Sequence, residues 1–197
     1  SEMVDVIGET VAKKLFKSIY KGTSQLSYQT IKVKDVFTGG DTRKYAFELC
    51  DHYCIETVCI QRKTGTTVCV STMVGCPVGC VFCESGKNCF IRNLTPSEIV
   101  QQIVLLREKV NRIVFMGMGE PLMNYPNVMK AIDMITSSEG LGMSPKRITV
   151  STSGIPKMIK KMADDEVKFK LAVSLHSAVE EIRNEIMPFT KSFPLTD

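Results

Sequence analysis

The sequence lacks several features that would place it in a special class of protein. It contains no tryptophan and only two histidines, and aromatic residues make up 7% of its 197 residues. No apolar run approaches the roughly 18 consecutive residues of a membrane-spanning helix, so we expect no membrane association. No secretory signal is visible at the N-terminus, and no internal repeat or low-complexity segment is found. With 44% hydrophobic and 23% charged residues, we expect a globular cytoplasmic protein.

The sequence also lacks a strong excess of charge of either sign. Its 25 basic and 21 acidic side chains leave a net charge of +4. This mild basic excess permits a nucleic-acid partner but does not require one.

Cysteine, in contrast, is plentiful, with eight residues in the chain. An even number would suit a disulfide framework in a secreted protein. Here no secretory signal is visible and three cysteines are clustered in one short segment, so metal-bound thiolates in a reducing compartment fit better.

The clustered cysteines are Cys76, Cys80 and Cys83, with C-x3-C-x2-C spacing. Three thiolates on one loop can hold three irons of a cubane [4Fe-4S] cluster, which leaves the fourth iron open to bind a small molecule and pass it an electron. The alternative is a structural zinc site with its fourth ligand from Cys69, Cys89 or His176. Zinc prefers pairs of closely spaced ligands, so the spacing favours the cluster.

Hydrophobic patterning predicts a small N-terminal extension followed by alternating strands and helices. The extension consists of a helix at 3–20 and a hairpin with strands at 45–49 and 55–60. A strand at 67–72 leads into the cysteine loop. The later strands are expected at 112–116, 147–151 and 169–175, and the helices at 95–110, 126–138, 156–164 and 179–186. Thr95 and Glu98 predict a capping box at the first of these helices.

Strand–helix alternation at this spacing predicts a parallel α/β sheet. The series holds about four βα units, whereas a closed TIM barrel needs eight, so a partial barrel or an open sheet is expected. The boundary between the two parts is expected between residues 62 and 66. It divides the chain into an accessory unit at 1–62 and a barrel unit at 63–197.

Polar or glycine-rich residues follow each strand of this series, at 76–83, 117–120, 151–154 and 174–176. The carboxyl ends of parallel strands share one edge of a sheet, so these segments should meet at one site.

Each segment also has an ordinary structural explanation. The glycines at 117 and 119 permit close approach to a ligand, and Glu120 can accept bonds from an ammonium group, but the same residues suit a plain turn. Ser151 and Ser174 can bind a carboxylate or a ribose, or simply end a strand. A lone histidine such as His176 is more often part of the core or rim than a catalyst.

The motifs together resemble one enzyme family. The cysteine loop is similar to that of the radical S-adenosylmethionine (radical-SAM) superfamily. The further motifs GMGEPLMN, ITVSTSG and LAVSLH, at 117–124, 148–154 and 171–176, resemble the dual-specificity RNA methyltransferases that act on adenine C2 in 23S rRNA and tRNA. The resemblance runs from about residue 45 to the end. It implies a partial (βα)6 TIM-like barrel, truncated here to about four βα units, with a small helical and hairpin extension.

The resemblance also implies residue roles. Cys76, Cys80 and Cys83 would ligate a [4Fe-4S] cluster. The contacts to S-adenosylmethionine would come from Gly119, Glu120, Ser151, Ser174, Leu175 and His176. Cys69 matches a second catalytic cysteine that resolves the protein–RNA intermediate, and Glu56 matches the general base. On composition alone these two would be a buried strand thiol and a solvated strand carboxylate.

The implied partners are 23S rRNA, tRNA and an electron donor such as a flavodoxin-type reductase. Two S-adenosylmethionine molecules and the cluster would supply radical chemistry for an electrophilic ring carbon that polar methyl transfer cannot attack. The rivals are the sister family that methylates adenine C8, another radical-SAM reaction, and a metal-stabilised RNA-binding fragment without turnover. Pro121 and Ser153 favour C2 over C8.

One implied part does not occur in the sequence. The family carries an asparagine that contacts S-adenosylmethionine and a methyl-carrier cysteine in a region beyond Asp197. None of the eight cysteines occupies the carrier position. We therefore expect either a fragment of a longer enzyme or a degenerate paralogue, and the intact motifs favour the fragment.

Overall fold

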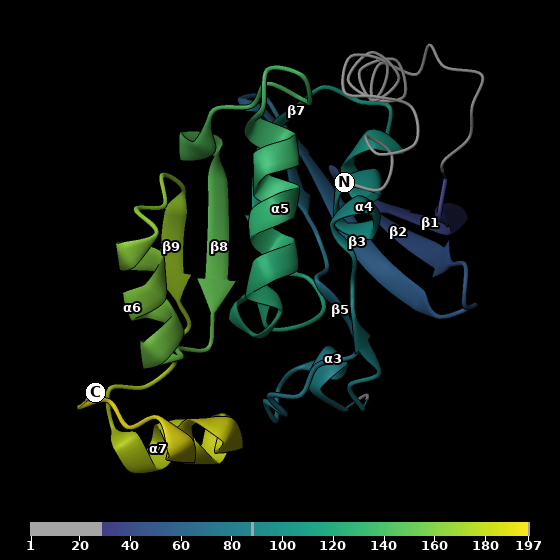
Figure 1. The fold of residues 1–197 in the computed structure, drawn as a ribbon. Coiled ribbons are helices and arrows are strands. Elements are labelled where there is room, and N and C mark those ends of the chain that lie inside the picture. Colours follow the sequence, from purple (N-terminus) through teal and green to yellow (C-terminus); the bar gives the residue numbers. More distant parts are fainter. Residues whose placement is uncertain (1–28, 88, 197) are drawn as a thin grey trace.

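A computed structural model describes residues 29–87 and 89–196 (Figure 1). The helix predicted at 3–20 lies outside this part. The described chain forms a mixed seven-stranded sheet with the order β1-β2-β3-β4-β7-β8-β9. Neighbouring strands are antiparallel from β1 to β4 and parallel from β4 to β9. None of the described helices is both long and apolar enough to cross a membrane.

The strands and helices alternate after β4. The strands of the main sheet are β1 (Ile31–Gly39), β2 (Thr42–Leu49), β3 (Cys54–Arg62), β4 (Gly65–Cys69), β7 (Val110–Phe115), β8 (Ile148–Thr152) and β9 (Lys170–Val173). A separate two-stranded sheet pairs β5 (Met73–Val74) with β6 (Arg92–Asn93). The helices are α3 (Glu84–Lys87), α4 (Pro96–Val104), α5 (Tyr125–Thr136), α6 (Pro156–Asp164) and α7 (Glu180–Ile186), with short 3-10 turns at Pro121–Asn124, Pro145–Arg147 and Pro188–Ser192.

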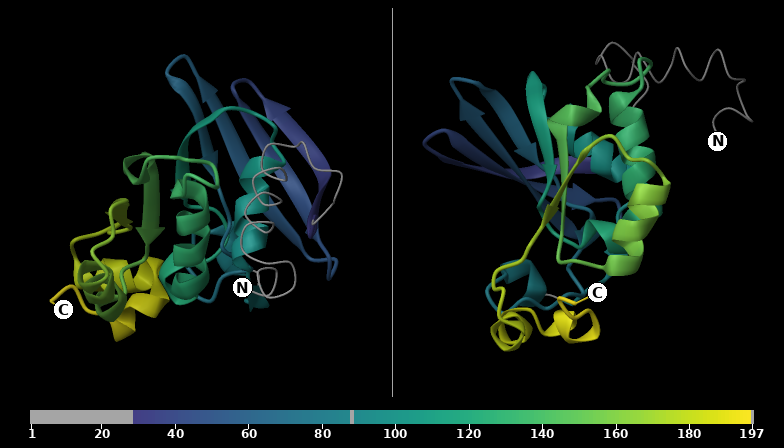
Figure 2. Two further views of the ribbon diagram at one scale, coloured as in Figure 1. Left: turned by 45° about the horizontal axis from the view of Figure 1, so that its top comes forward. Right: turned by 90° about the vertical axis from the view of Figure 1, so that its left-hand side faces the viewer.

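The described helices cover one face of the sheet. In Figure 2, α4, α5 and α6 lie on the same side of the strands, and no described helix covers the other side. Burial alternates accordingly along the strands, since successive side chains point to opposite faces. The buried core on the helix-covered face includes Phe47, Ile55, Val68, Ile113, Phe115, Val150, Val128 and Ile135. We call the opposite, half-exposed side the helix-free face.

The predicted hairpin is confirmed, with longer strands than expected. β2 and β3 pair antiparallel from Thr42–Ile60 to Glu48–Cys54. The sequence did not indicate β1, which pairs with β2 at the edge of the sheet. Its residues after Ile31 are all exposed, so no buried apolar face marks it as a strand.

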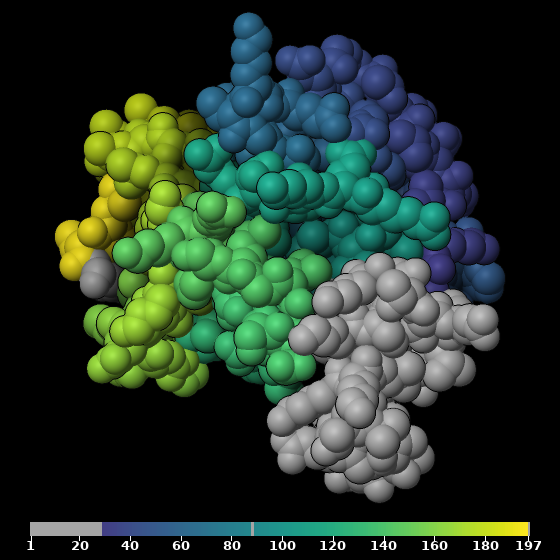
Figure 3. Space-filling model, turned by 90° about the horizontal axis from the view of Figure 1, so that it is seen from above, coloured from purple at the N-terminus to yellow at the C-terminus, as the bar shows by residue number. Residues whose placement is uncertain are grey.

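One sheet crosses the boundary predicted at residues 62–66. β3 pairs antiparallel with β4, from Val58–Cys69 to Arg62–Gly65. Side chains from both parts also belong to one hydrophobic core. Seen from above (Figure 3), the antiparallel strands and the C-terminal segment lie on opposite sides of the molecule. The division into two units therefore stays a prediction.

The first helix of the series begins where the sequence predicts and ends earlier. Thr95 accepts a hydrogen bond from the Glu98 amide while Glu98 bonds back to the Thr95 amide, which confirms the capping box. The helix ends at Val104 instead of about 110. Arg107 has a φ of 52°, a left-handed conformation that turns the chain towards β7.

Candidate active site

The segments that follow β4, β7, β8 and β9 lie at one edge of the sheet, as parallel strands require. Figure 1 shows α3 and α7 together at this end, beyond the arrowheads of β8 and β9. A direct contact joins the cysteine loop before α3 to α7, because the Val81 amide donates to the Ile186 carbonyl at 3.0 Å. The predicted convergence of distant segments is therefore present in the fold.

The three clustered cysteines are half-buried in the loop before α3. Burial, together with the neighbouring thiols Cys76 and Cys83, raises the pKa of Cys80 to about 11. Burial also raises the pKa of Cys76, and the carboxylate of Glu120 adds to this effect. The thiols are thus close enough to repel one another as thiolates, a repulsion that a bound cation removes.

The donor set of this loop suits an iron–sulfur cluster, which is held by thiolates. In residues 29–87 and 89–196 no three His, Cys, Asp or Glu side chains are arranged closely enough to enclose a metal ion. The fit therefore rests on the chemistry and spacing of Cys76, Cys80 and Cys83. Cys89, a candidate fourth zinc ligand, is exposed.

The glycines after β7 are required by close packing against the chain that leaves β4. A Cβ on Gly117 would lie 2.7 Å from the Val70 carbonyl oxygen. Gly119 has a φ of 101°, and a Cβ there would lie 2.6 Å from the side chain of Met73. This packing explains the glycines without a ligand, so their predicted role in cofactor binding remains a prediction.

Glu120 lies between the ends of β7 and β8. Its carboxylate is buried, with 3% exposure, and Oε2 accepts the Ser153 amide at 2.7 Å. Oε1 accepts the Leu122 amide at 3.0 Å. A carboxylate has about four acceptor sites, so two remain for a donor such as an ammonium group.

The other predicted cofactor contacts also come together. The hydroxyls of Ser151 on β8 and Ser174 after β9 lie 3.5 Å apart. His176 has a φ of 58°, and its ring centroid lies 4.7 Å from that of Phe82, which stands between two of the clustered cysteines. The β9 segment thus contacts the cysteine loop. Leu175, between Ser174 and His176, is exposed.

Arg183 on α7 was not indicated by the sequence, although it holds this edge together. The residue is 3% exposed, and Nη2 donates to the Ser153 carbonyl at 2.7 Å. Nη1 lies 3.5 Å and 3.4 Å from the carbonyls of Ser174 and Leu175. An arginine in a short polar helix is typical of a solvated surface, so only the tertiary fold reveals this role.

Glu56 and Cys69 share the helix-free face. Cys69 lies opposite Val58 in the β3–β4 ladder, and Glu56 is two residues from Val58 along β3, so all three point the same way. Burial raises the pKa of the Cys69 thiol. The Glu56 carboxylate is half-exposed and forms an ion pair with Lys44 at 2.8 Å.

Ser71 connects the strand of Glu56 to the glycine loop, which the sequence did not indicate. Its Oγ donates to the Glu56 carbonyl at 2.6 Å and accepts the Met118 amide at 2.9 Å. Its own amide donates to Oε1 of the buried Gln102 at 2.8 Å. Gln102 also accepts the Thr57 hydroxyl at 2.7 Å, so α4 is fastened to both segments.

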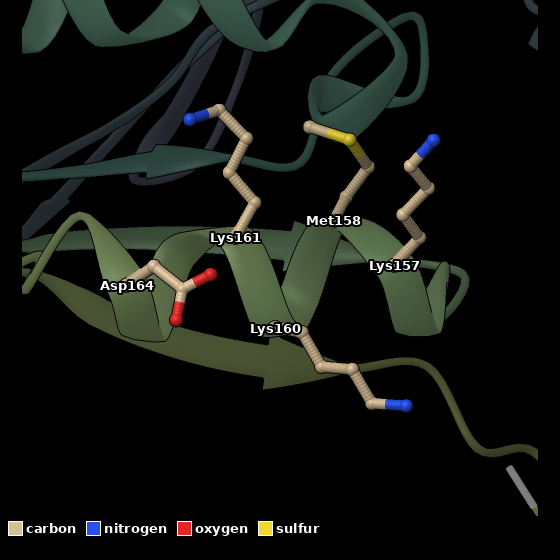
Figure 4. A pocket seen from close by; sticks show the side chains of 5 residues that line it. All are labelled: Lys157, Met158, Lys160, Lys161 and Asp164. Atoms are coloured by element: carbon tan, nitrogen blue, oxygen red, sulfur yellow. The ribbon is translucent and has the colours of Figure 1, made fainter.

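A hollow beside α6 is separate from these groups. It measures about 490 Å³ and is lined by Lys157, Met158, Lys160, Lys161 and Asp164 (Figure 4). None of the predicted site residues lines it. It therefore takes no part in the arrangement at the sheet edge.

The sequence matches the profile of the Radical SAM superfamily over residues 70–193, which is more than half of the chain. The chain belongs to the radical SAM superfamily. The match includes the cysteine loop and every parallel strand after β4, and it confirms the α/β radical SAM fold with its mixed sheet. Membership implies a [4Fe-4S] cluster and S-adenosylmethionine as cofactors.

Named relatives of this radical SAM chain are RNA methyltransferases. It is 59% identical over 194 residues to the probable dual-specificity RNA methyltransferase RlmN of Flavobacterium psychrophilum. This alignment covers 91% of this chain and 56% of the relative. The chain is 40% identical over 213 residues to the RlmN of Dictyoglomus thermophilum, with 99% and 61% covered. The chain thus spans little more than half the length of these curated relatives.

A solved structure agrees with the fold. The crystal structure of a radical SAM methyltransferase from Sphaerobacter thermophilus has a TM-score of 0.90 and 32% sequence identity. It covers 99% of this radical SAM chain and 66% of the other chain.

Proposed function

We propose that this chain is the cluster-bearing part of a radical SAM methyltransferase that modifies C2 of adenine in 23S rRNA and tRNA. The relatives named above support the reaction and the substrates. The observation that carries the proposal is the shared face of Glu56 and Cys69, next to the edge where the two strand-end serines meet and where His176 contacts the cysteine loop.

The cofactor residues have clear proposed roles. Cys76, Cys80 and Cys83 would hold the cluster, which together with S-adenosylmethionine supplies the one-electron chemistry when bound. The side chains and backbone that would bind S-adenosylmethionine are Gly119, Glu120, Ser151, Ser174, Leu175 and His176. The free acceptor sites of Glu120 suit its ammonium group, and the paired serine hydroxyls suit its carboxylate or ribose.

Glu56 and Cys69 would act on the RNA. The half-exposed carboxylate of Glu56 can reach a substrate on the helix-free face and take the proton from the adenine ring carbon. Cys69 would then resolve the protein–RNA intermediate. Its raised pKa keeps the thiol protonated until a base or substrate activates it.

The rest of the architecture belongs to the same proposal. The four parallel strands β4, β7, β8 and β9 would be the first part of a (βα)6 barrel, with residues 1–62 as an accessory unit and 63–197 as the barrel unit. In a longer protein the missing strands would bring the methyl-carrier cysteine. A flavodoxin-type reductase would supply the electron.

The deciding experiment uses a full-length protein that contains this sequence, reconstituted anaerobically. We expect iron and sulfide in the purified protein, cleavage of S-adenosylmethionine to 5′-deoxyadenosine, and 2-methyladenosine in rRNA and tRNA digests by mass spectrometry. Stoichiometric zinc without iron, or RNA binding without cleavage, contradicts the proposal.

The same digests separate the two methyltransferase families. Formation of 8-methyladenosine would assign the sister activity. Pro121 and Ser153 favour C2, and both are buried at the sheet edge beside Glu120.

A further inference from the structure

Three side chains form a contact chain on the helix-free face, starting from the proposed base. Glu56 forms an ion pair with Lys44, whose Nζ lies 2.8 Å from Oε1 of Glu56. The same ammonium lies over the ring of Phe37, 5.3 Å from its centroid. Phe37 pairs with Lys44 across β1 and β2, so both residues and Glu56 belong to one face.

The fold does not depend on this ion pair. The side chains of Lys44 and Glu56 are 43% and 50% exposed. Exposed ion pairs stabilise proteins little, because solvent screens the charges and two long side chains must be ordered. A role for the pair must therefore be sought in the position of the carboxylate itself.

The lysine has a second support that a solvated surface lysine lacks. Phe37 is 53% exposed, and its ring contacts the Lys44 ammonium from β1. Glu56 contacts the same ammonium from β3, on the other side of β2. The ammonium is therefore held by a ring on one strand and by a carboxylate on another. These two contacts favour one arrangement of the Lys44 and Glu56 side chains on the face that also carries Cys69.

We propose that Lys44 is a positioning residue for Glu56, and that Phe37 seats Lys44. The inference rests on the proposed function, in which Glu56 takes the ring proton of adenine. Proton transfer requires the base to lie within hydrogen-bond reach of that proton, so a freely rotating carboxylate loses rate.

The test compares Lys44→Met, Lys44→Arg and Phe37→Leu in the full-length, cluster-loaded protein. In Lys44→Met we expect kcat for RNA methylation to fall by about tenfold or more while KM for RNA stays within about twofold. Lys44→Arg should restore most of the rate, and Phe37→Leu should give a smaller fall. Formation of 5′-deoxyadenosine and the thermal unfolding midpoint should not change in any of these variants.

Lys32→Met is the matched control. Lys32 pairs with Glu48 at 3.3 Å across β1 and β2, whereas the Lys44–Glu56 pair lies across the neighbouring strands β2 and β3, and Glu48 has no proposed role in the reaction. Its removal should leave kcat and KM unchanged. An equal fall in kcat in Lys32→Met would show a general charge effect and overturn the inference.

Two further results would overturn the inference. An increase in KM for RNA with unchanged kcat in Lys44→Met would make Lys44 an RNA phosphate contact. A crystal structure of Lys44→Met with the Glu56 carboxylate in its original position would exclude positioning whatever the activity. Absence of methylation by the unaltered protein would instead refute the proposed function, since this structural readout needs no turnover.

Discussion

Two independent features of the structure require glycine at position 119: the backbone conformation and the space available for a side chain. The φ of 101° at Gly119 is strained for any residue with a Cβ, and that Cβ would also collide with Met73. Glycine at this position thus holds the loop before Glu120 against the segment before the cysteine loop. The steric demand exists whether or not a ligand approaches.

We predict that Gly119→Ala destabilises the protein by about 3 kcal/mol, because strain and steric overlap add. The measurement is the free energy of unfolding in urea. Gly40→Ala is the matched control, since Gly40 has a φ of 55° but no atom lies within 4 Å of the position that a Cβ would take there. It should cost only about 1 kcal/mol, and equal losses would refute the steric account.

Glu98 ionises more readily than an ordinary glutamate, and this makes it a pH-sensitive residue. Burial alone would raise its pKa, but hydrogen bonds from Arg92 and Thr95 outweigh burial and lower the pKa below 4.5. A lowered pKa adds stability that is fully present above the unfolded value of 4.5 and is lost as the pH falls through the folded value.

We therefore predict that Glu98→Gln is less stable than the parent protein by about 2 kcal/mol at pH 7. The difference should shrink as the pH falls below 4.5, because the parent carboxylate is then protonated too. Urea unfolding at several pH values measures it. Glu166→Gln, at an exposed pair with Lys168, should show little difference at any pH, and a constant deficit in Glu98→Gln would contradict the linkage.

At the scale of elements, α4 is attached to the sheet by the amide of Gln102. The side chain is fully buried and takes part in hydrogen bonds with Thr57, Ser71 and the Glu98 carbonyl. Such a satisfied polar network fixes the helix in one register against β3 and the chain after β4.

We predict that Gln102→Leu costs about 3 kcal/mol, since the Thr57 hydroxyl and the Ser71 amide lose their acceptor while buried. Gln101→Leu, at the preceding position of α4, should cost less than about 1 kcal/mol, because water can replace its solvent-exposed hydrogen bonds to Thr30 and Ser97. Chemical unfolding of both variants gives the comparison. Similar losses would mean that burial of the network is unimportant.

Elements with local signals were predictable from the sequence, and those that depend on distant partners were not. Thr95 and Glu98 identify the start of α4 because a capping box lies within four residues. β1 has a weaker signal, since its apolar–polar alternation covers only Ile31 to Lys34 and is broken by a register shift between Val33 and Asp35. Its existence depends on pairing with β2.

The candidate site follows the same division. The cysteine spacing and the polar strand ends are local patterns, so the sequence indicated which residues converge. The roles of Ser71 and Arg183 depend on bonds between segments far apart in the chain. The residues next to Ser71 and Arg183 in the sequence do not indicate that these side chains form such bonds.

At the scale of the whole molecule, the antiparallel strands and the parallel strands share a sheet and a core. β4 pairs with β3 on one side and with β7 on the other. Phe47, Leu49 and Ile55 from the antiparallel part are buried in the common core.

We predict that residues 63–197 alone do not unfold cooperatively, because β4 becomes an exposed edge and the core loses these three side chains together with Ile31, Tyr45 and Cys59. The check is a comparison of urea unfolding curves for 63–197 and for the entire chain. Binding of a fluorescent dye to exposed apolar surface gives a second readout. A sharp transition for 63–197 would support two independent units.

The Ser71 hydroxyl couples the backbone of Glu56 to the glycine loop. One hydroxyl bonds to the carbonyl of Glu56 and to the amide of Met118 in the glycine loop. A shift of that loop must therefore either break the bridge or pull the strand of Glu56 with it. A ligand that displaces the glycine loop would therefore also displace the backbone of Glu56, through a single shared oxygen atom.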